Sequence, residues 1–190
     1  YFTYSAMNAG KSAILLQAAY NYKECGMQVM LWTSGHYGVD QDATMGKIES
    51  RIGLEADAYL YRADTDLFAA IEKEHKEKTL SVIFFDEAQF LTKDQVWQLA
   101  RVGDQLKLPV LCYGLRTDFQ GELFEGSSAL LAIADDLREA RTICHCGKKA
   151  TMTARMDEHG NAIKSGEQVS VGKEVYVSLC RYHWEEALGR

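Results

Sequence analysis

The sequence lacks most of the features that mark disordered, membrane-spanning or secreted chains. It has one proline in 190 residues and no low-complexity tract, so a long disordered linker is not expected. No apolar run reaches the roughly 18 residues that cross a bilayer, and no segment reads as a signal peptide. The five cysteines are an odd number, which without a secretory signal indicates a reducing compartment. We therefore expect a cytoplasmic protein that contacts no membrane.

The sequence also has fewer basic than acidic residues. Lysine and arginine total 21 against 27 aspartate and glutamate residues, for a net charge of −6 and an isoelectric point near 5.4. An acidic chain is poorly suited to binding a polyanion, so nucleic acid is not an expected partner, whereas a small ligand with a bound metal is compatible. The length suits one full domain with a small additional lobe. Residues 1–5 already alternate like a strand, so native residues are expected before Tyr1.

Strands and helices are predicted to alternate over most of the chain. The apolar runs of strand length are residues 1–5, 27–33, 58–61, 81–85 and 109–114. Helices are predicted over residues 10–25, 64–78 and 92–107, the last with Thr92 as its N-cap. The glycine-rich segment 34–53 is predicted to be a long loop. This alternation is typical of an α/β fold with a parallel sheet covered on both faces.

A phosphate-binding motif lies between the first strand and the first helix. Residues 5–12 read SAMNAGKS, which matches G-x-x-x-x-G-K-S except that Ser5 replaces the first glycine. In such a motif Lys11 would reach the β- and γ-phosphates of ATP, and the Ser12 hydroxyl would bind Mg²⁺. The predicted ATP-binding residues are Ser5, Ala6, Met7, Asn8, Ala9, Gly10, Lys11 and Ser12. The alternative is a chance GKS in an ordinary loop.

An acidic pair follows the apolar strand 81–85. In phosphate-loop enzymes an aspartate at this point holds Mg²⁺, which assigns that role to Asp86. Glu87 is then the candidate general base, and with Lys11 it makes the predicted catalytic pair. Glu87 would take its proton from a hydroxyl acceptor in a kinase, or activate water in an ATPase. The local sequence leaves both open, as well as an ordinary acidic start to a helix.

Cysteine and histidine gather in the predicted second lobe, residues 141–190. A C-x-C pair and a C-x-x-H pair offer three thiolates and one imidazole, which suit a structural, tetrahedral Zn²⁺. The predicted ligands are Cys144, Cys146, Cys180 and His183. His145 is a rival ligand, although alternation along a strand would turn it away. The alternative is two unrelated cysteine pairs in a reducing compartment.

Together these motifs resemble those of the zinc-containing thymidine kinases, the type II family. The resemblance is carried, in order over about residues 1–188, by MNAGKS, DEAQF, CYGLRTDFQGELF, the C-x-C and C-x-x-H set, and YVSLCRYH. It implies a RecA-like phosphate-loop sheet over residues 1–140 and a small zinc-binding lid lobe over residues 141–190. It also implies transfer of the ATP γ-phosphate to the 5′-hydroxyl of thymidine or deoxyuridine, a homotetramer, and feedback inhibition by dTTP.

The resemblance also assigns a nucleoside pocket and the groups around it. The pocket residues would be Met7, Gln89, Phe90, Leu115, Phe119, Phe124, Thr153, Val169, Ser170, Val171, Gly172 and Tyr176. An arginine near the acceptor would neutralise phosphate charge, and the candidates are Arg51, Arg116 and Arg155, the last two favoured because each lies beside a motif. Segments 34–50 and 169–176 depart from the family pattern, which bears on nucleoside specificity. A RecA-like ATPase without a nucleoside acceptor is the alternative function.

Overall fold

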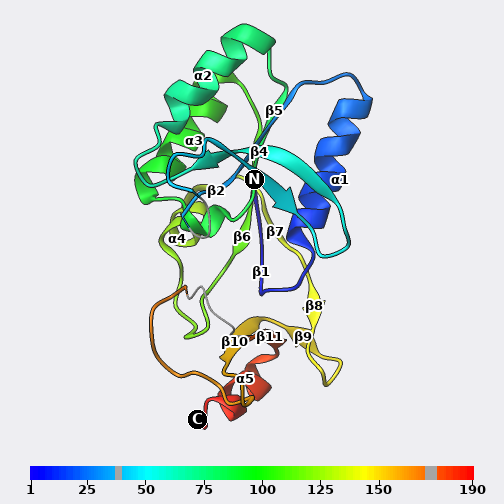
Figure 1. Ribbon diagram of the computed structural model, residues 1–190, viewed down its shortest axis with the longest axis vertical. Coiled ribbons are helices and arrows are strands. Elements are labelled where there is room, and N and C mark those ends of the chain that lie inside the picture. The colour runs from blue at the N-terminus through cyan, green and yellow to red at the C-terminus, as the bar shows by residue number, and fades with distance from the viewer. Residues whose placement is uncertain (37–39, 170–174) are drawn as a thin grey trace.

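The computed structural model describes residues 1–36, 40–169 and 175–190, which fold into an α/β layer with a smaller lobe at one end (Figure 1). Within this part of the chain, seven strands form one sheet in the order β3-β4-β2-β5-β6-β1-β7. The strands are β1 (Phe2–Ser5), β2 (Val29–Ser34), β3 (Met45–Glu49), β4 (Glu55–Tyr61), β5 (Val82–Phe85), β6 (Val110–Leu115) and β7 (Leu137–Glu139). All neighbouring strands run parallel except β3 and β4. The predicted α/β class with a mostly parallel sheet is confirmed.

Helices cover both faces of this sheet. Helix α1 (Lys11–Glu24) packs on one face, and α2 (Leu67–Lys78), α3 (Lys93–Leu106) and α4 (Glu125–Ile133) pack on the other. Strand β5 shows why its sequence is apolar throughout. Val82 and Phe84 belong to the core under α1, while their neighbours Ile83 and Phe85 belong to the opposite core. A strand buried on both faces needs apolar residues at every position.

The start of helix α3 is fixed by its own sequence. Helix α3 begins as predicted at Thr92, whose side chain accepts a hydrogen bond from the backbone N–H of Gln95 while the Gln95 side chain bonds back to the backbone of Thr92. This reciprocal pair satisfies two N–H groups that a helix start leaves open.

No helix in the described part of the chain is long and apolar enough to cross a membrane.

Strands β3 and β7 and helix α4 are among the elements that were not predicted. Strand β3 lies within the segment that was predicted to be a loop. The sequence did not indicate a strand there because only Ile48 of its five residues is buried and the others show no apolar pattern. Strand β7 has three residues and pairs with β1 at the sheet edge. Helix α4 follows Phe124, which makes no side-chain cap, so nothing local marks its start.

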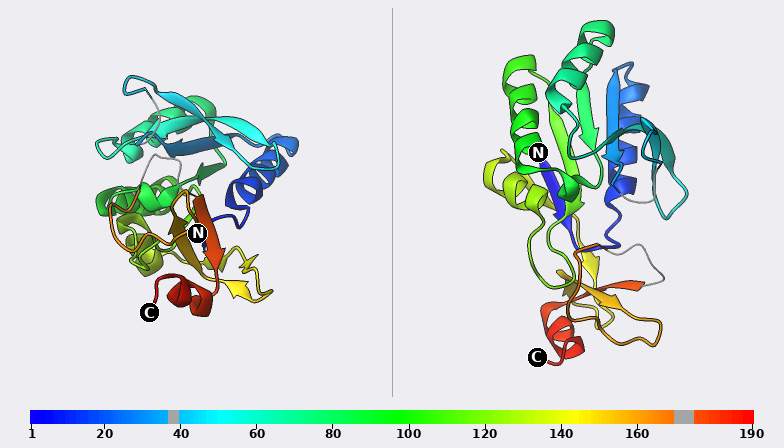
Figure 2. Two further views of the ribbon diagram at one scale, coloured as in Figure 1. Left: turned by 60° about the horizontal axis from the view of Figure 1, so that its bottom comes forward. Right: turned by 60° about the vertical axis from the view of Figure 1, so that its left-hand side comes forward.

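In the residues that the structure describes, the smaller lobe has two antiparallel ribbons and one helix, and it lies below the main sheet in Figure 1 and at the same end in Figure 2. Strands β8 (Thr142–Ile143) and β9 (Lys149–Ala150) form the first ribbon, and β10 (Met152–Met156) and β11 (Val175–Leu179) form the second. Helix α5 (Arg181–Ala187) packs against β10 and β11, with Trp184 in a small core of its own. The lobe thereby places the ribbon β10–β11 beside the loop that follows β1.

Candidate active site

The phosphate loop, residues 5–12, joins β1 to α1. Its left-handed residues are Asn8, with φ 61°, and Gly10, with φ 76°; Ser5 does not require the glycine-only backbone that the motif's first position can demand. The Ser5 hydroxyl instead donates to the Ala6 carbonyl at 2.6 Å and accepts from Lys11 Nζ at 2.9 Å. Ser5, which replaces the first glycine of the motif, therefore forms a hydrogen bond with the motif lysine, Lys11.

Lys11 lies at the buried start of α1, with 9% of its surface exposed. Burial lowers the pKa of Lys11, while the nearby carboxylates of Glu87 and Asp86 act in the opposite direction and favour its charged form. The charges of these two acids therefore favour the ammonium form of Lys11 against the effect of burial. This is the arrangement expected of a group that neutralises phosphate charge.

Asp86 follows β5 and is 4% exposed. Burial, together with the charge of Glu87, raises the pKa of Asp86 to about 7, against a hydrogen bond from the Ser12 side chain that lowers it. Within the described chain, Asp86 Oδ1 is buried without a hydrogen-bond partner. A buried carboxylate oxygen without a donor, beside a serine hydroxyl, fits a hard cation such as Mg²⁺.

Glu87 has an unusual backbone, with φ 53°. Tyr61 Oη donates to the Glu87 carbonyl at 2.7 Å, and Gln89 Nε2 donates to the Glu87 carboxylate at 2.5 Å. Gln89 lies in the short helix η1 (Ala88–Phe90) and accepts from the Leu115 N–H at 2.9 Å. A Cβ at Gly114 would lie 2.9 Å from Gln89 Oε1, so only glycine lets β6 pass this close.

Two cavities adjoin at Glu87. The first, about 340 Å³, is lined by Met7, Asn8, Ala9, Gly10, Lys11, Ser12, Ala13, Glu49, Ser50, Arg51, Ile52, Glu87 and Leu115. The second, about 140 Å³, is lined by Met7, Glu87, Gln89, Phe90, Leu115, Thr117, Asp118, Phe119, Phe124, Thr153, Gln168, Val169 and Tyr176. We call them the phosphate cavity and the aromatic cavity. They share Met7, Glu87 and Leu115.

The aromatic cavity gathers most of the predicted nucleoside residues from distant parts of the chain. Phe90 and Phe124 meet edge to face, with ring centroids 5.8 Å apart. Ser170, Val171 and Gly172, which were also predicted, lie outside the described residues. Thr117, Asp118 and Gln168 line the cavity without having been predicted. Thr117 and Asp118 belong to the GLRTDF segment, so their place within that motif was the available signal.

The three candidate arginines lie in different places. Arg51 lines the phosphate cavity. Arg116 Nη2 donates to the Thr151 carbonyl at 3.0 Å. Arg155 is 4% exposed and lies with its guanidinium 3.8 Å from the centre of the Phe119 ring, and it is not among the described residues that line either cavity. Arg51, the least favoured from sequence, is the arginine beside the phosphate loop.

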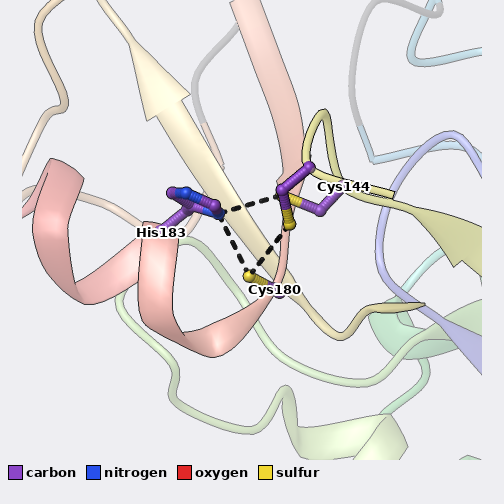
Figure 3. Close-up of side chains that lie close together, drawn as sticks. Cys144, Cys180 and His183 are labelled. Carbon is purple, nitrogen blue, oxygen red and sulfur yellow. Dashed lines mark hydrogen bonds between the residues drawn. The ribbon is translucent and has the colours of Figure 1, made fainter. Parts of the chain in front are cut away.

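The Cys/His group forms a compact cluster in the smaller lobe. The ligand atoms of Cys144, Cys146, Cys180 and His183 all lie within 4.8 Å of one another. His183 Nδ1 lies 3.5 Å from Cys144 Sγ and 3.2 Å from Cys180 Sγ, and Figure 3 shows its ring directed toward these two thiols. The Cys146 and Cys180 sulfurs are 3.9 Å apart, and sulfurs bound at about 2.3 Å to a tetrahedral Zn²⁺ lie about 3.8 Å apart. The cluster fits a structural zinc site.

His145 takes a different position from the one expected. Its ring lies against the His183 ring, with centroids 4.3 Å apart, and its Nδ1 is 3.7 Å from Cys144 Sγ. The residue is in a turn rather than in strand β8, so strand alternation does not turn it away. It nevertheless stays outside the four-residue group.

An α/β sheet with a phosphate loop, a following acidic pair and a Cys₃His cluster that fits zinc is the architecture of a phosphate-loop nucleotide-binding protein. The thymidine kinase family model matches residues 1–184. The chain is 60% identical to the thymidine kinase of Mesorhizobium japonicum, covering all of this chain and 92% of that relative. It is 58% identical to the thymidine kinase of Vibrio cholerae, covering all of this chain and 98% of that relative. The chain belongs to the thymidine kinase family, as the sequence motifs predicted.

Proposed function

We propose that this chain transfers the γ-phosphate of ATP to the 5′-hydroxyl of thymidine, and also of deoxyuridine, and so supplies dTMP in pyrimidine deoxynucleotide salvage. The observation that carries the proposal is that the phosphate cavity and the aromatic cavity share Glu87. A triphosphate in the first and a nucleoside in the second would bring the γ-phosphate and the hydroxyl together at that carboxylate. Family membership supports the choice of thymidine.

Residues of the phosphate loop would bind and orient the triphosphate. Backbone N–H groups at the start of α1 would contact phosphate oxygens, and Lys11 would neutralise charge on the β- and γ-phosphates. Ser12 and Asp86 would hold Mg²⁺, which supplies further positive charge when bound with ATP. Arg51, which lines the same cavity, is the arginine we favour for an additional phosphate contact.

Glu87 would act as the general base. Its carboxylate would accept the proton of the 5′-hydroxyl as that oxygen attacks the γ-phosphorus and the bond from the γ-phosphorus to the bridging oxygen breaks. Gln89 orients this carboxylate through its 2.5 Å hydrogen bond. Phosphoryl transfer depends on alignment more than on covalent assistance, so a carboxylate held in place is sufficient.

The aromatic cavity would bind the nucleoside base and sugar. Phe90, Phe124 and Tyr176 would present aromatic surface to a flat base, while Thr153 would offer a polar group in the same cavity. Ser170, Val171 and Gly172 remain candidates for backbone contacts to the base. Thr153 Oγ1 already accepts from the Met7 N–H at 3.2 Å, which connects this wall to the phosphate loop.

The remaining features of the proposal concern the whole protein. We propose a catalytic domain over residues 1–140 and a zinc-held lid lobe over residues 141–190. Zn²⁺ at the Cys₃His cluster would be structural, because four protein ligands leave no open position. We further propose a cytoplasmic homotetramer that is inhibited by dTTP and binds neither nucleic acid nor membrane.

The proposal is tested by measuring Mg·ATP consumption with no nucleoside and with thymidine, deoxyuridine, deoxycytidine or deoxyguanosine. We expect ATP use only with thymidine or deoxyuridine, with the nucleoside monophosphate as product. ATP use that is the same with and without any nucleoside would support the second candidate, a RecA-like ATPase in which Glu87 activates water. No product with any pyrimidine nucleoside would contradict the kinase assignment.

A further inference from the structure

Residues 166–168, which precede β11 in the chain, each form a hydrogen bond with a different side chain. Gln120 Nε2 donates to the Gly166 carbonyl at 3.1 Å, and Arg155 Nη1 donates to the Glu167 carbonyl at 3.0 Å. The Gln168 side chain donates from Nε2 to Asp118 Oδ2 at 3.0 Å. We call Asp118, Gln120 and Arg155 the clasp.

Arg155 provides a rigid base for the clasp. It is buried, and its guanidinium stacks 3.8 Å above the Phe119 ring. Gly166 has φ 140°, and a Cβ there would lie 2.8 Å from Arg155 Nη2. A side chain at residue 166 would therefore both strain the backbone and displace the arginine, so the glycine is needed for this close approach.

Asp118 has each of its oxygens committed. Oδ1 accepts from the N–H groups of Gln120 and Glu122, both at 2.9 Å, which fixes the turn that presents Phe119. Oδ2 accepts from Gln168. Asp118 is 3% exposed, and a buried carboxylate is stable only where its lone pairs meet donors. The hydrogen bond between Gln168 and Asp118 thus links two segments that are 50 residues apart.

The clasp acts on the wall of the aromatic cavity. Asp118 and Phe119 line that cavity, and so do Gln168 and its neighbour Val169 from a distant segment of the chain. A change in the Asp118–Gln168 hydrogen bond therefore alters the separation of two segments that line the aromatic cavity. The phosphate cavity shares neither residue, so the same change leaves the walls around the phosphate loop in place.

We propose that Asp118 and Gln168 are a positioning pair that sets nucleoside affinity by holding residues 166–169 against the GLRTDF segment. This inference rests on the proposed nucleoside kinase function. Neither residue needs to touch the reacting atoms. The pair controls binding of the acceptor, whereas ATP binding and the chemical step depend on Lys11, Asp86 and Glu87.

The test uses Gln168→Glu, which places a second carboxylate opposite Asp118 and removes the donor. We expect the KM for thymidine to rise about tenfold, the equivalent of one lost hydrogen bond of roughly 1.4 kcal/mol. We expect kcat and the KM for ATP to stay within about twofold of wild type, because the phosphate cavity is intact. Gln105→Glu, on the exposed side of α3, makes the same charge change elsewhere and is the matched control.

Rescue separates positioning from a general loss of structure. In the double variant Asp118→Asn with Gln168→Glu, the oxygen of the introduced amide still accepts from the turn, and its NH₂ group donates to the new carboxylate. We expect the thymidine KM to return to near the wild-type value. Asp118→Asn alone is expected to change KM little, because the Gln168 amide can turn to offer its oxygen to the new donor. Absence of rescue, or an equal rise in the KM for ATP, would overturn the proposal.

The same proteins separate failure of this inference from failure of the proposed function. Wild-type protein that consumes no ATP with thymidine would remove the proposed function. Limited proteolysis within residues 163–169 still tests the clasp in that case. We expect faster cleavage there in Gln168→Glu and the wild-type rate in the double variant; an unchanged rate in Gln168→Glu would overturn the clasp whatever the activity.

Discussion

At the scale of single residues, Glu87 combines a strained backbone with the position of the proposed general base. Its left-handed φ of 53° costs a non-glycine residue about 1 kcal/mol, and the hydrogen bond from Tyr61 to the Glu87 carbonyl offsets that cost. The turn directs the carboxylate back to Gln89 and into both cavities. Strain at this residue is thus coupled to the position of the proposed base.

Glu87→Gln tests the base directly. The amide keeps the shape of the side chain but cannot accept the hydroxyl proton, so we expect kcat to fall by a factor of about 100 or more. Nucleotide binding should stay close to wild type, because Lys11, Ser12 and Asp86 are unchanged. Single-turnover rates together with calorimetric ATP titration provide the measurement. A fully active variant would remove Glu87 from the role of base.

Tyr61→Phe tests the support of that residue. Tyr61 is fully buried and its hydroxyl is the donor to the Glu87 carbonyl. The substitution leaves a buried carbonyl without this donor, and we expect it to lower the free energy of unfolding by about 1–3 kcal/mol. We also expect a several-fold fall in kcat with little change in either KM. Urea unfolding and steady-state kinetics on the same preparation check both, and unchanged kcat would show that the Glu87 turn holds without Tyr61.

At the scale of elements, strongly patterned segments could be predicted and weakly patterned ones could not. Strand β5 is apolar at every position and α3 carries a capping box, so both follow from sequence alone. Strand β3 is an antiparallel edge strand with one buried residue, and its pairing depends on β4 rather than on its own composition. The phosphate loop could be predicted because its residues are consecutive in the sequence. The place of Arg51 could not, because it depends on the β3–β4 turn that brings this residue to the phosphate cavity.

The β10–β11 ribbon also holds the phosphate loop. Thr153 Oγ1 accepts from the Met7 N–H, and Ser178 Oγ donates to the Met7 carbonyl at 2.5 Å. Asn8 Nδ2 donates to the Tyr176 carbonyl at 3.2 Å. Both peptide groups of Met7 are therefore bonded to the ribbon, so the ribbon and the phosphate loop are expected to move together.

Ser178→Ala tests this connection. Removing the hydroxyl frees the Met7 carbonyl, and we expect the KM for ATP to rise by about threefold to tenfold, the range for one hydrogen bond. Thermal stability should fall by only a few degrees. Ser128→Ala, on the exposed face of α4, is the matched control. ATP kinetics identical to wild type would mean that Thr153 and Asn8 are sufficient to hold the loop.

At the scale of the whole molecule, the smaller lobe supplies residues to the aromatic cavity, although its four candidate zinc ligands are not among the described residues that line that cavity. The four ligands lie on the turn after β8, at the end of β11 and on α5. The ribbon they support supplies Thr153 and Tyr176 to the aromatic cavity. The spacing of the cysteines predicted the cluster, but its connection to the phosphate loop depends on tertiary contacts that no local pattern encodes.

Zinc removal is therefore expected to act at a distance. Purified without chelator, the wild-type chain should contain stoichiometric zinc by metal analysis, and Cys146→Ser should contain much less. Because metal binding contributes to folding of such a small core, we expect Cys146→Ser to show faster proteolysis within residues 141–190 and to lose most kinase activity. Cys25→Ser changes an exposed thiol at the end of α1 and should retain both zinc and activity. Full activity in a zinc-free Cys146→Ser protein would show that the ribbon keeps its place without the metal, and zinc-free wild type would remove the zinc assignment itself.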